Sequence, residues 1–273
     1  MSYRFVRSVS LVVALMVPLA ADAQPAKKKD KAAPAQVTAA ATALAGADLD
    51  AAAKAAGVLG KDKSPAGLDA LLDALAMGLH PKVAAAALDA LAVRKKAIAF
   101  DTLVAYSEHR DPKVRAAAVG ALAALDDRRV DKHILAALRD GIASVRAAAA
   151  SAVASRKLRG GVEPLLALLV KGDEAAASAL APLADPEVAR KVAEAIGRAP
   201  DVAVAKCLGK ILVRPDFKPD SARLEVVRAL GRIDAHEAIE QLTIYLASVP
   251  ARPPRPSRAE AERLIEEKVG GVK

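Results

Sequence analysis

The chain has 273 residues, a formal net charge of +9 and 53% hydrophobic residues, of which a large part are alanine. Aromatic residues make up only 2% of the chain, and tryptophan is absent. Strands favour β-branched and aromatic residues, whereas alanine is the strongest helix former, so this composition argues against a β-rich fold. It predicts an all-α protein whose small side chains bring the helices close together.

The first 23 residues are predicted to be a secretory signal peptide. A short basic start containing Arg4 and Arg7 precedes an apolar run, residues 9–20, that is too short to span a bilayer stably. The run ends in Ala21-Asp22-Ala23, the pattern of a signal peptidase site, so cleavage is expected before Gln24. An uncleaved interfacial anchor is the alternative. Cleavage predicts an exported protein, periplasmic or extracellular, with no transmembrane segment in the mature chain.

Residues 24–46 are predicted to be a flexible tether. Lysines at positions 27, 28, 29 and 31 are surrounded by alanine and proline. Such a composition cannot bury enough apolar surface to order itself.

Residues 47–249 carry an internal repeat. Val83, Val114 and Val145 follow one another at intervals of 31 residues, and each opens an alanine-rich string. A second set with the same period consists of Leu72, Leu103, Ile134 and Leu165. Apolar residues fall at helical spacing within each string, so the repeat unit is predicted to be two antiparallel helices. Leu135 and Leu166 are predicted to lie in the core between units.

Proline and aspartate mark several helix starts. Asp111-Pro112 and Asp185-Pro186 place a good N-cap residue before a proline at the first helical position. Residues 219–246 align without gaps on residues 111–138, which predicts a further unit. Between them, the helix pairing of residues 173–217 stays open because the segment is irregular in length.

At these residues the chain resembles the HEAT-repeat family, in particular the short bacterial class named after phycobilisome lyases. Its units read approximately D-x-x-V-R-x-x-A-x-x-A-L, and Asp111, Val114 and Arg115 with the alanines that follow fit that pattern. The unit that begins at His80 lacks both the Asp and the Arg. The resemblance implies a right-handed α-solenoid in which the second helix of each pair lines a concave, partner-binding surface.

Residues 250–273 are predicted to be a Pro/Arg-rich spacer followed by a terminal helix. The segment from Pro250 to Pro256 is rich in proline and arginine, which favours an extended polyproline conformation. Ser257 and Glu260 have the spacing of a capping box for an amphipathic helix that continues to Lys268.

The sequence offers no candidate for catalysis, for a cofactor or for a metal. Its four histidines are never three or four residues apart, and the lone cysteine, Cys207, lies in an apolar stretch. We therefore expect Cys207 to be a buried thiol rather than a reactive one. No nucleophile elbow, P-loop or dinucleotide fingerprint occurs.

Arginines recur at the start of successive units, as Arg115, Arg146 and Arg223. Recurrence from repeat to repeat is what packing requires, so we expect these side chains to join turns. A role in ligand binding is the alternative.

Helical geometry predicts the outward face of the second helices. If Leu103 points inward, the candidate concave stripe consists of Asp101, Thr102, Lys132, His133, Glu163 and Lys171. Charges of both signs alternate along it, which suits ion pairs between units and would repel a phosphate backbone at every acidic position.

Basic residues cluster in the turns between the first and second helices of the units. This candidate basic ridge consists of Arg94, Lys95, Lys96, Arg128, Arg129, Arg156, Lys157 and Arg159. Solvated turns that favour solubility are one interpretation. Attraction of an anionic envelope surface or another anionic partner is the other.

Together these features predict an exported, non-catalytic scaffold that binds a protein or another macromolecule in the cell envelope. The alternatives are a protein that binds nucleic acid or an anionic polymer, and a lyase-like accessory enzyme. The scarcity of aromatic residues for base stacking and the predicted export argue against nucleic acid as the partner.

Overall fold

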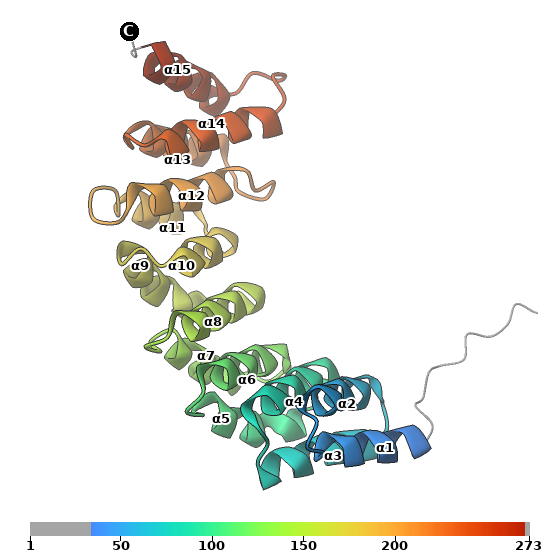
Figure 1. Cartoon of the computed structure of the whole chain (residues 1–273). Coiled ribbons are helices and arrows are strands. Elements are labelled where there is room, and N and C mark those ends of the chain that lie inside the picture. The colour runs from blue at the N-terminus through green and yellow to red at the C-terminus, as the bar shows by residue number, and fades with distance from the viewer. Residues whose placement is uncertain (1–33, 271–273) are drawn as a thin grey trace, which may run out of the picture. The chain divides into compact units, whose positions relative to one another are not determined.

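The structure is a computed structural model, and it describes residues 34–270. Within this range the protein consists of α-helices joined by short turns (Figure 1). The helices of the first half are α1 (Pro34–Leu44), α2 (Leu49–Lys61), α3 (Pro65–Met77), α4 (Pro81–Arg94), α5 (Phe100–Ser107), α6 (Pro112–Ala124), α7 (Val130–Ala137) and α8 (Ala143–Arg156). Those of the second half are α9 (Val162–Val170), α10 (Glu174–Leu180), α11 (Pro186–Ala193), α12 (Asp201–Leu212), α13 (Asp220–Gly231), α14 (His236–Ser248) and α15 (Pro256–Gly270). Short 3-10 turns η1 (Ala97–Ala99), η2 (Arg159–Gly161) and η3 (Ala181–Leu183) lie next to α5, α9 and α10.

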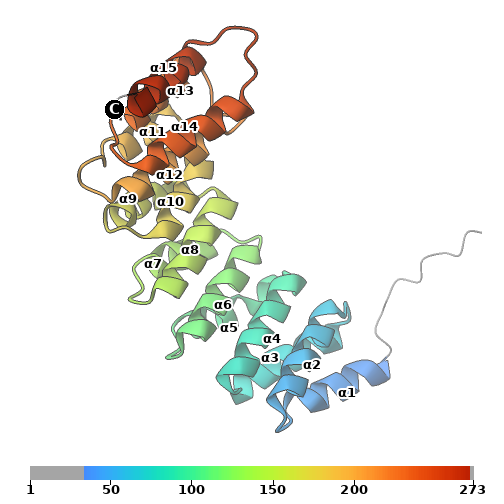
Figure 2. The same cartoon turned by 45° about the horizontal axis from the view of Figure 1, so that its top comes forward.

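The helices form two layers. Each even-numbered helix from α2 to α12 packs against the next even-numbered helix, and the odd-numbered helices form a second layer that is more loosely packed from α1 to α11 (Figure 2). We call the turns that follow even-numbered helices the first edge, and the turns that follow odd-numbered helices the second edge. This arrangement confirms the predicted all-α solenoid of helix pairs.

Small residues allow the even layer to pack closely. A Cβ atom added to Gly60 of α2 would lie 2.8 Å from the Cβ atom of Ala90 in α4. Helices whose backbones approach this closely gain contacts along their whole length, which offsets the small apolar area of each alanine. The expected link between alanine content and close helix packing is therefore present.

The core follows the predicted period from Leu103 onward, but Leu72 is only half-buried, because Leu71 takes the central position there. Leu103, Ile134 and Leu165 are fully buried, as are the valines that open the alanine-rich strings. Leu135 and Leu166 are only half-buried at the margin of the core. Their neighbours Ile134 and Leu165 take the central positions, so this part of the prediction was wrong by one residue.

The flexible tether predicted over residues 24–46 is wrong for residues 34–44. Residues 34–44 form α1, whose Val37, Ala40 and Leu44 are buried on one face. A single face of three apolar residues, docked on α2 and α3, is enough to order a segment that carries no charge. Residues 24–33 of the predicted tether and the predicted signal peptide lie outside the described residues.

The chain also continues as a solenoid beyond residue 249. Helix α15 packs on α13 and α14, and residues 250–255 are a turn between two stacked helices rather than a spacer to a separate element. Ser257 lies inside α15, where it is buried and contacts Asp220 and Tyr245. The predicted capping box is therefore wrong, because the serine hydroxyl bonds to neighbouring helices and not to its own.

The irregular segment contributes three helices, α10, α11 and α12. As a result α13 stacks on α11 and α15 in the odd layer, although its sequence aligns with α6 of the even layer. The turn at Asp234 consequently belongs to the second edge, and the sequence alignment had assigned it to the first.

Candidate functional site

Arginines of the second edge join successive turns. Arg115 of α6 bonds through Nε and NH2 to the carboxylate of Asp140, at 2.8 and 3.0 Å, and donates to the carbonyl oxygen of His109 in its own turn. Arg146 of α8 repeats the arrangement. Its Nε atom lies 2.9 Å from Oδ2 of Asp173, and NH1 donates to the carbonyl oxygen of Asp140. The predicted structural role of these two arginines is thus what the contacts show.

We call the two contacts Arg115–Asp140 and Arg146–Asp173 the ladder, and electrostatics strengthen it. The hydrogen bonds from Arg115 hold the pKa of the Asp140 carboxyl below its usual range, and the same contact raises the pKa of Arg115. The side chains of both residues are less than one-fifth exposed, so water screens the pair less than it screens a surface ion pair. Arg223 does not join the ladder, because the displacement of α13 puts it beside the carbonyl oxygen of Arg214 on the first edge.

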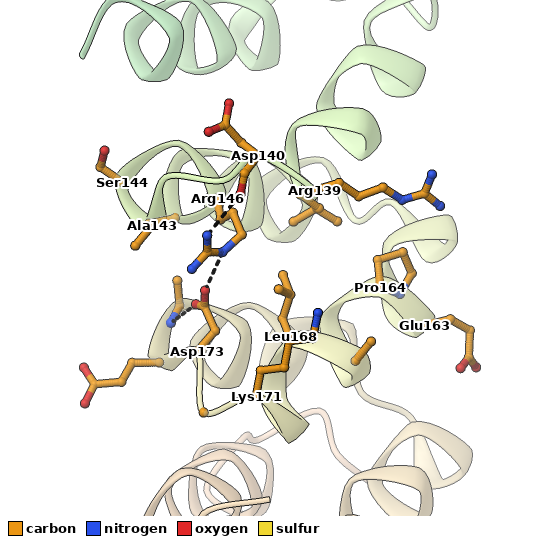
Figure 3. A pocket seen from close by; sticks show the side chains of 16 residues that line it. Arg139, Asp140, Ala143, Ser144, Arg146, Glu163, Pro164, Leu168, Lys171 and Asp173 are labelled. Carbon is orange, nitrogen blue, oxygen red and sulfur yellow. Dashed lines mark hydrogen bonds and ion pairs between the residues drawn. The ribbon is translucent and has the colours of Figure 1, made fainter. Parts of the chain in front are cut away.

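A pocket of about 1250 Å³ opens beside the second rung of the ladder (Figure 3). It lies between the α7–α8 pair and the α9–α10 pair. Its walls are formed by Leu138, Arg139, Asp140, Ala143, Ser144, Arg146, Ala147, Glu163, Pro164, Ala167, Leu168, Lys171, Gly172, Asp173, Glu174 and Ala175. The odd layer is loosely packed here, so Pro164, Ala167 and Leu168 of α9 stay exposed or half-buried, whereas Val162, Leu165 and Leu169 on the same helix are buried.

Most carboxylates of the pocket are already engaged. Asp140 and Asp173 are bound by the two ladder arginines, and Glu163 forms an ion pair of 2.7 Å with Lys191 of α11. Arg139 and Lys171 are exposed and form no ion pair within residues 34–270. Figure 3 shows Arg146 between the Asp140 and Asp173 turns, with Arg139 extending away from them. The pocket therefore offers apolar walls with two available cations at its margin.

The candidate concave stripe divides between three odd-layer helices. Glu163 and Lys171 line the pocket, and sequence reasoning therefore found two of its residues. Asp101 and Thr102 lie on α5, whereas Lys132 and His133 lie on α7 outside the pocket. The expected ion pair of Lys132 with Glu163 is not formed, since Glu163 pairs with Lys191. The ring of His133 instead packs edge-on against Phe100, with 5.8 Å between ring centroids.

Half of the residues of the candidate basic ridge form ion pairs or hydrogen bonds with other residues of the protein. The side chain of Arg94 is 5% exposed, donates to the carbonyl oxygen of Ser64 and lies 4.0 Å from Asp62. Arg156 pairs with Asp131 and donates to the carbonyl oxygen of Leu125.

Two further ridge arginines are also paired. Arg129 bonds to Asp127 and lies 4.2 Å above the ring of Phe100. Arg159 pairs with Asp185 at 3.0 Å. Four of the eight residues of the candidate basic ridge are therefore already paired within the protein. The members left exposed and outside ion pairs are Lys95, Lys96, Arg128 and Lys157.

Sequence reasoning missed the apolar walls of the pocket. Ala147 and Leu168 belong to ordinary helical patterns, and nothing in their spacing distinguishes them from core residues. The pocket lies where α7 and α9 have little direct contact with each other, which the 31-residue period does not encode.

Other chemistry is limited in the part of the chain that the structure describes. Burial raises the pKa of the Cys207 thiol to about 12, and this agrees with the expected buried cysteine. Residues 34–270 contain no cluster of His, Cys, Asp and Glu side chains that could hold a metal ion. No helix in that range has the length and apolarity required to cross a membrane.

Comparisons with solved structures give matches of low sequence identity. The chain is similar to a chain of the complex of CpcE and CpcF of phycocyanin lyase from Nostoc sp. PCC7120, with 20% identity, a TM-score of 0.46, and coverage of 93% of this chain and 100% of that one. It is also similar to human deoxyhypusine hydroxylase in complex with glycerol, with 18% identity, a TM-score of 0.41, and coverage of 86% and 96%. An engineered protein matches with 21% identity, a TM-score of 0.46, and coverage of 84% and 77%.

No curated protein matches the chain significantly. The family described as HEAT repeats matches residues 68–154, the segment from α3 to α8 where the 31-residue period is most regular. This match shows that residues 68–154 consist of HEAT repeats, and the helix pairs described above stack in the same manner on both sides of that segment.

Proposed function

We propose that this HEAT-repeat scaffold is exported, acts without catalysis and binds a protein partner in the cell envelope. The observation that carries the proposal is the pocket between the α7–α8 and α9–α10 pairs. Ala147, Pro164 and Leu168 give it apolar walls, and Arg139 and Lys171 supply cations that no internal carboxylate neutralises. A cleft of this kind suits the apolar face of a helical segment with acidic residues at its border.

The state of the ionisable groups supports a binding role. Three of the four carboxylates in the pocket, Asp140, Glu163 and Asp173, accept from arginine or lysine, so they are poor general bases. The thiol of Cys207 is buried and its pKa is raised, which disfavours the nucleophilic thiolate. These features favour recognition over chemistry at the surface.

Export rests on the first 23 residues, whose basic start, apolar run and Ala21-Asp22-Ala23 have the order of a cleaved signal peptide. The mass of the protein recovered from the host envelope should correspond to a chain that begins at Gln24. Recovery of the protein from the cytoplasm with Met1 retained would refute export and leave the binding proposal standing.

Binding is tested with two alanines at the same repeat position. Ala167 of α9 is exposed and lines the pocket, whereas Ala136 of α7 is exposed outside it. Full chains carrying Ala167→Arg and Ala136→Arg are used to capture partners from host envelope extract. We expect Ala167→Arg to lose a partner that the parent and Ala136→Arg both retain, because the long side chain fills the pocket. Equal recovery with all three proteins would overturn the assignment of the pocket.

A further inference from the structure

The first edge carries more available positive charge than the sequence indicated. Its turns comprise residues 62–64, 95–99, 125–129, 157–161, 181–185, 213–219 and 249–255. Eight cations in these turns, and Lys61 at the end of α2, form no ion pair in the described range; the eight are Lys63, Lys95, Lys96, Arg128, Lys157, Lys218, Arg252 and Arg255. Within the same turns, Asp126 is the one exposed carboxylate outside an ion pair.

Contacts between turns show that the edge is continuous through its first half. Arg94 donates to the carbonyl oxygen of Ser64, which places the turn after α4 beside the turn after α2. The guanidinium of Arg129 lies over Phe100, and Arg156 donates to the carbonyl oxygen of Leu125. Neighbouring turns from α2 to α8 are therefore side by side.

The second half continues in the same way. Arg159 pairs with Asp185, and Arg214 donates to the carbonyl oxygen of Ala184, so the turns after α8, α10 and α12 are adjacent. Ser257 donates to Asp220, which brings the turn after α14 next to the start of α13. The engaged arginines thus hold the turns together, and the remaining cations are left facing solvent along them.

Apolar side chains accompany the charge at one point on this edge. Val93 is 64% exposed and Ile98 is 69% exposed, and they flank Lys95 and Lys96 in sequence. A polyphosphate or an acidic polysaccharide offers no apolar side chain for them to contact. An acidic polypeptide can supply carboxylates and an apolar group together, so the composition of the edge favours a protein ligand.

The spacing of successive turns along the first edge agrees with the length of an extended polypeptide. Packed helices lie about 8–10 Å apart, and an extended polypeptide advances about 3.3 Å per residue. Successive turns therefore match approximately every third residue of an extended segment. We propose that the first edge binds an extended acidic segment of the protein partner, with its carboxylates on the edge cations and an apolar side chain against Val93 and Ile98. The inference rests on the proposed protein-binding function and assigns it a second surface.

A peptide of known sequence tests this. The probe is a fluorescent 18-residue peptide with Glu at every third position and Ser or Val elsewhere, and its affinity for the full chain is measured by anisotropy at low and at physiological salt. In an edge variant, six cations are changed to Gln: Lys61, Lys63, Lys95, Lys96, Arg128 and Lys157. In a charge-matched control, six exposed cations elsewhere are changed to Gln: Lys54, Arg110, Lys113, Lys132, Arg198 and Arg232.

We expect the parent to bind the peptide more weakly at the higher salt, because the contacts are exposed. At low salt the edge variant should bind about tenfold more weakly than the parent, and the control within about twofold of it, since each exposed contact is weak and several must act together. Equal weakening of both variants would show that net charge alone drives association and would overturn the proposal. Absence of binding by the parent at low salt would do the same.

The nature of the ligand is tested with Ile98→Ser. This change should weaken binding of the peptide that contains Val and leave binding of an all-Ser version unchanged. If vesicles of phosphatidylglycerol and phosphatidylcholine, or inorganic polyphosphate, lose binding to the edge variant while the peptide does not, the edge is a lipid or polyphosphate surface and the proposal is wrong. Capture through the pocket is measured separately with Ala167→Arg, so a failure of the edge is distinguishable from a failure of the proposed function.

Discussion

The side chains of Arg115 and Asp140 meet across a repeat boundary through two hydrogen bonds of 2.8 and 3.0 Å. Changing Arg115 to Ala removes both bonds and leaves a carboxylate that is only 15% exposed without its cation. We expect the free energy of unfolding to fall by about 2 kcal/mol, the usual scale for hydrogen bonds to charged groups. Urea denaturation measures this. Lys113→Ala, an exposed change on the same helix, should stay within about 0.5 kcal/mol of the parent.

The same pair predicts a dependence on pH. Hydrogen bonds from Arg115 lower the pKa of Asp140 in the folded state, so its contribution to stability is present above the unfolded pKa of about 3.9 and is lost as pH falls through the folded pKa. Asp140→Asn should therefore be less stable than the parent at pH 7, and the two stabilities should converge as the solution is acidified below about pH 4. Denaturation curves that stay equally far apart down to pH 2 would contradict the assignment.

Two glycines of α2 provide a matched pair of substitutions with opposite expected effects on stability. A Cβ atom at Gly60 would lie 2.9 Å from Cα of Ala90, so Gly60→Ala forces the backbones of α2 and α4 apart. We expect a loss of about 1–3 kcal/mol from this overpacking. Nothing lies within 4 Å of a Cβ atom at Gly57, and there alanine should stabilise the helix by up to about 1 kcal/mol. Thermal melts that shift in the same direction for both variants would show that the even helices are not in close contact.

Neighbouring residues of α7 test the register of the core. Ile134 is fully buried and Leu135 is half-buried beside Gly160 and Gly161. Ile134→Ala should cost about 2–5 kcal/mol, because it leaves a cavity, and Leu135→Ala should cost clearly less. The reverse order in urea denaturation would mean that α7 is rotated by one residue.

The fold could be predicted from the sequence because the apolar residues that recur every 31 positions are the ones that are buried. Val83, Val114 and Val145 all lie in the core, as their spacing predicted. The layer occupied by α13 could not be predicted, because residues 173–217 supply three helices and an odd number exchanges the layers that follow. The local sequence pattern identifies a helix, but the layer that the helix occupies depends on how many helices precede it.

The candidate site was less predictable, for a different reason. A sequence shows which residues are charged, but it does not show which of them form ion pairs or hydrogen bonds within the protein. Arg94 and Arg156 have the same local context as Lys95 and Lys157, yet the arginines reach backbone carbonyl oxygens of the preceding turn while the lysines remain exposed. Such contacts join residues about one repeat apart and depend on the stacking distance.

Photocrosslinking in the host tests the scaffold proposal most directly. A benzophenone amino acid is introduced at position 167, on the pocket wall, or at position 136, at the equivalent position of α7 outside the pocket. Irradiation of intact cells should give one discrete protein adduct from position 167 and none from position 136. Adducts of the same mass and yield from both positions, or none from position 167, would contradict the account of a scaffold that binds its partner between the α7–α8 and α9–α10 pairs.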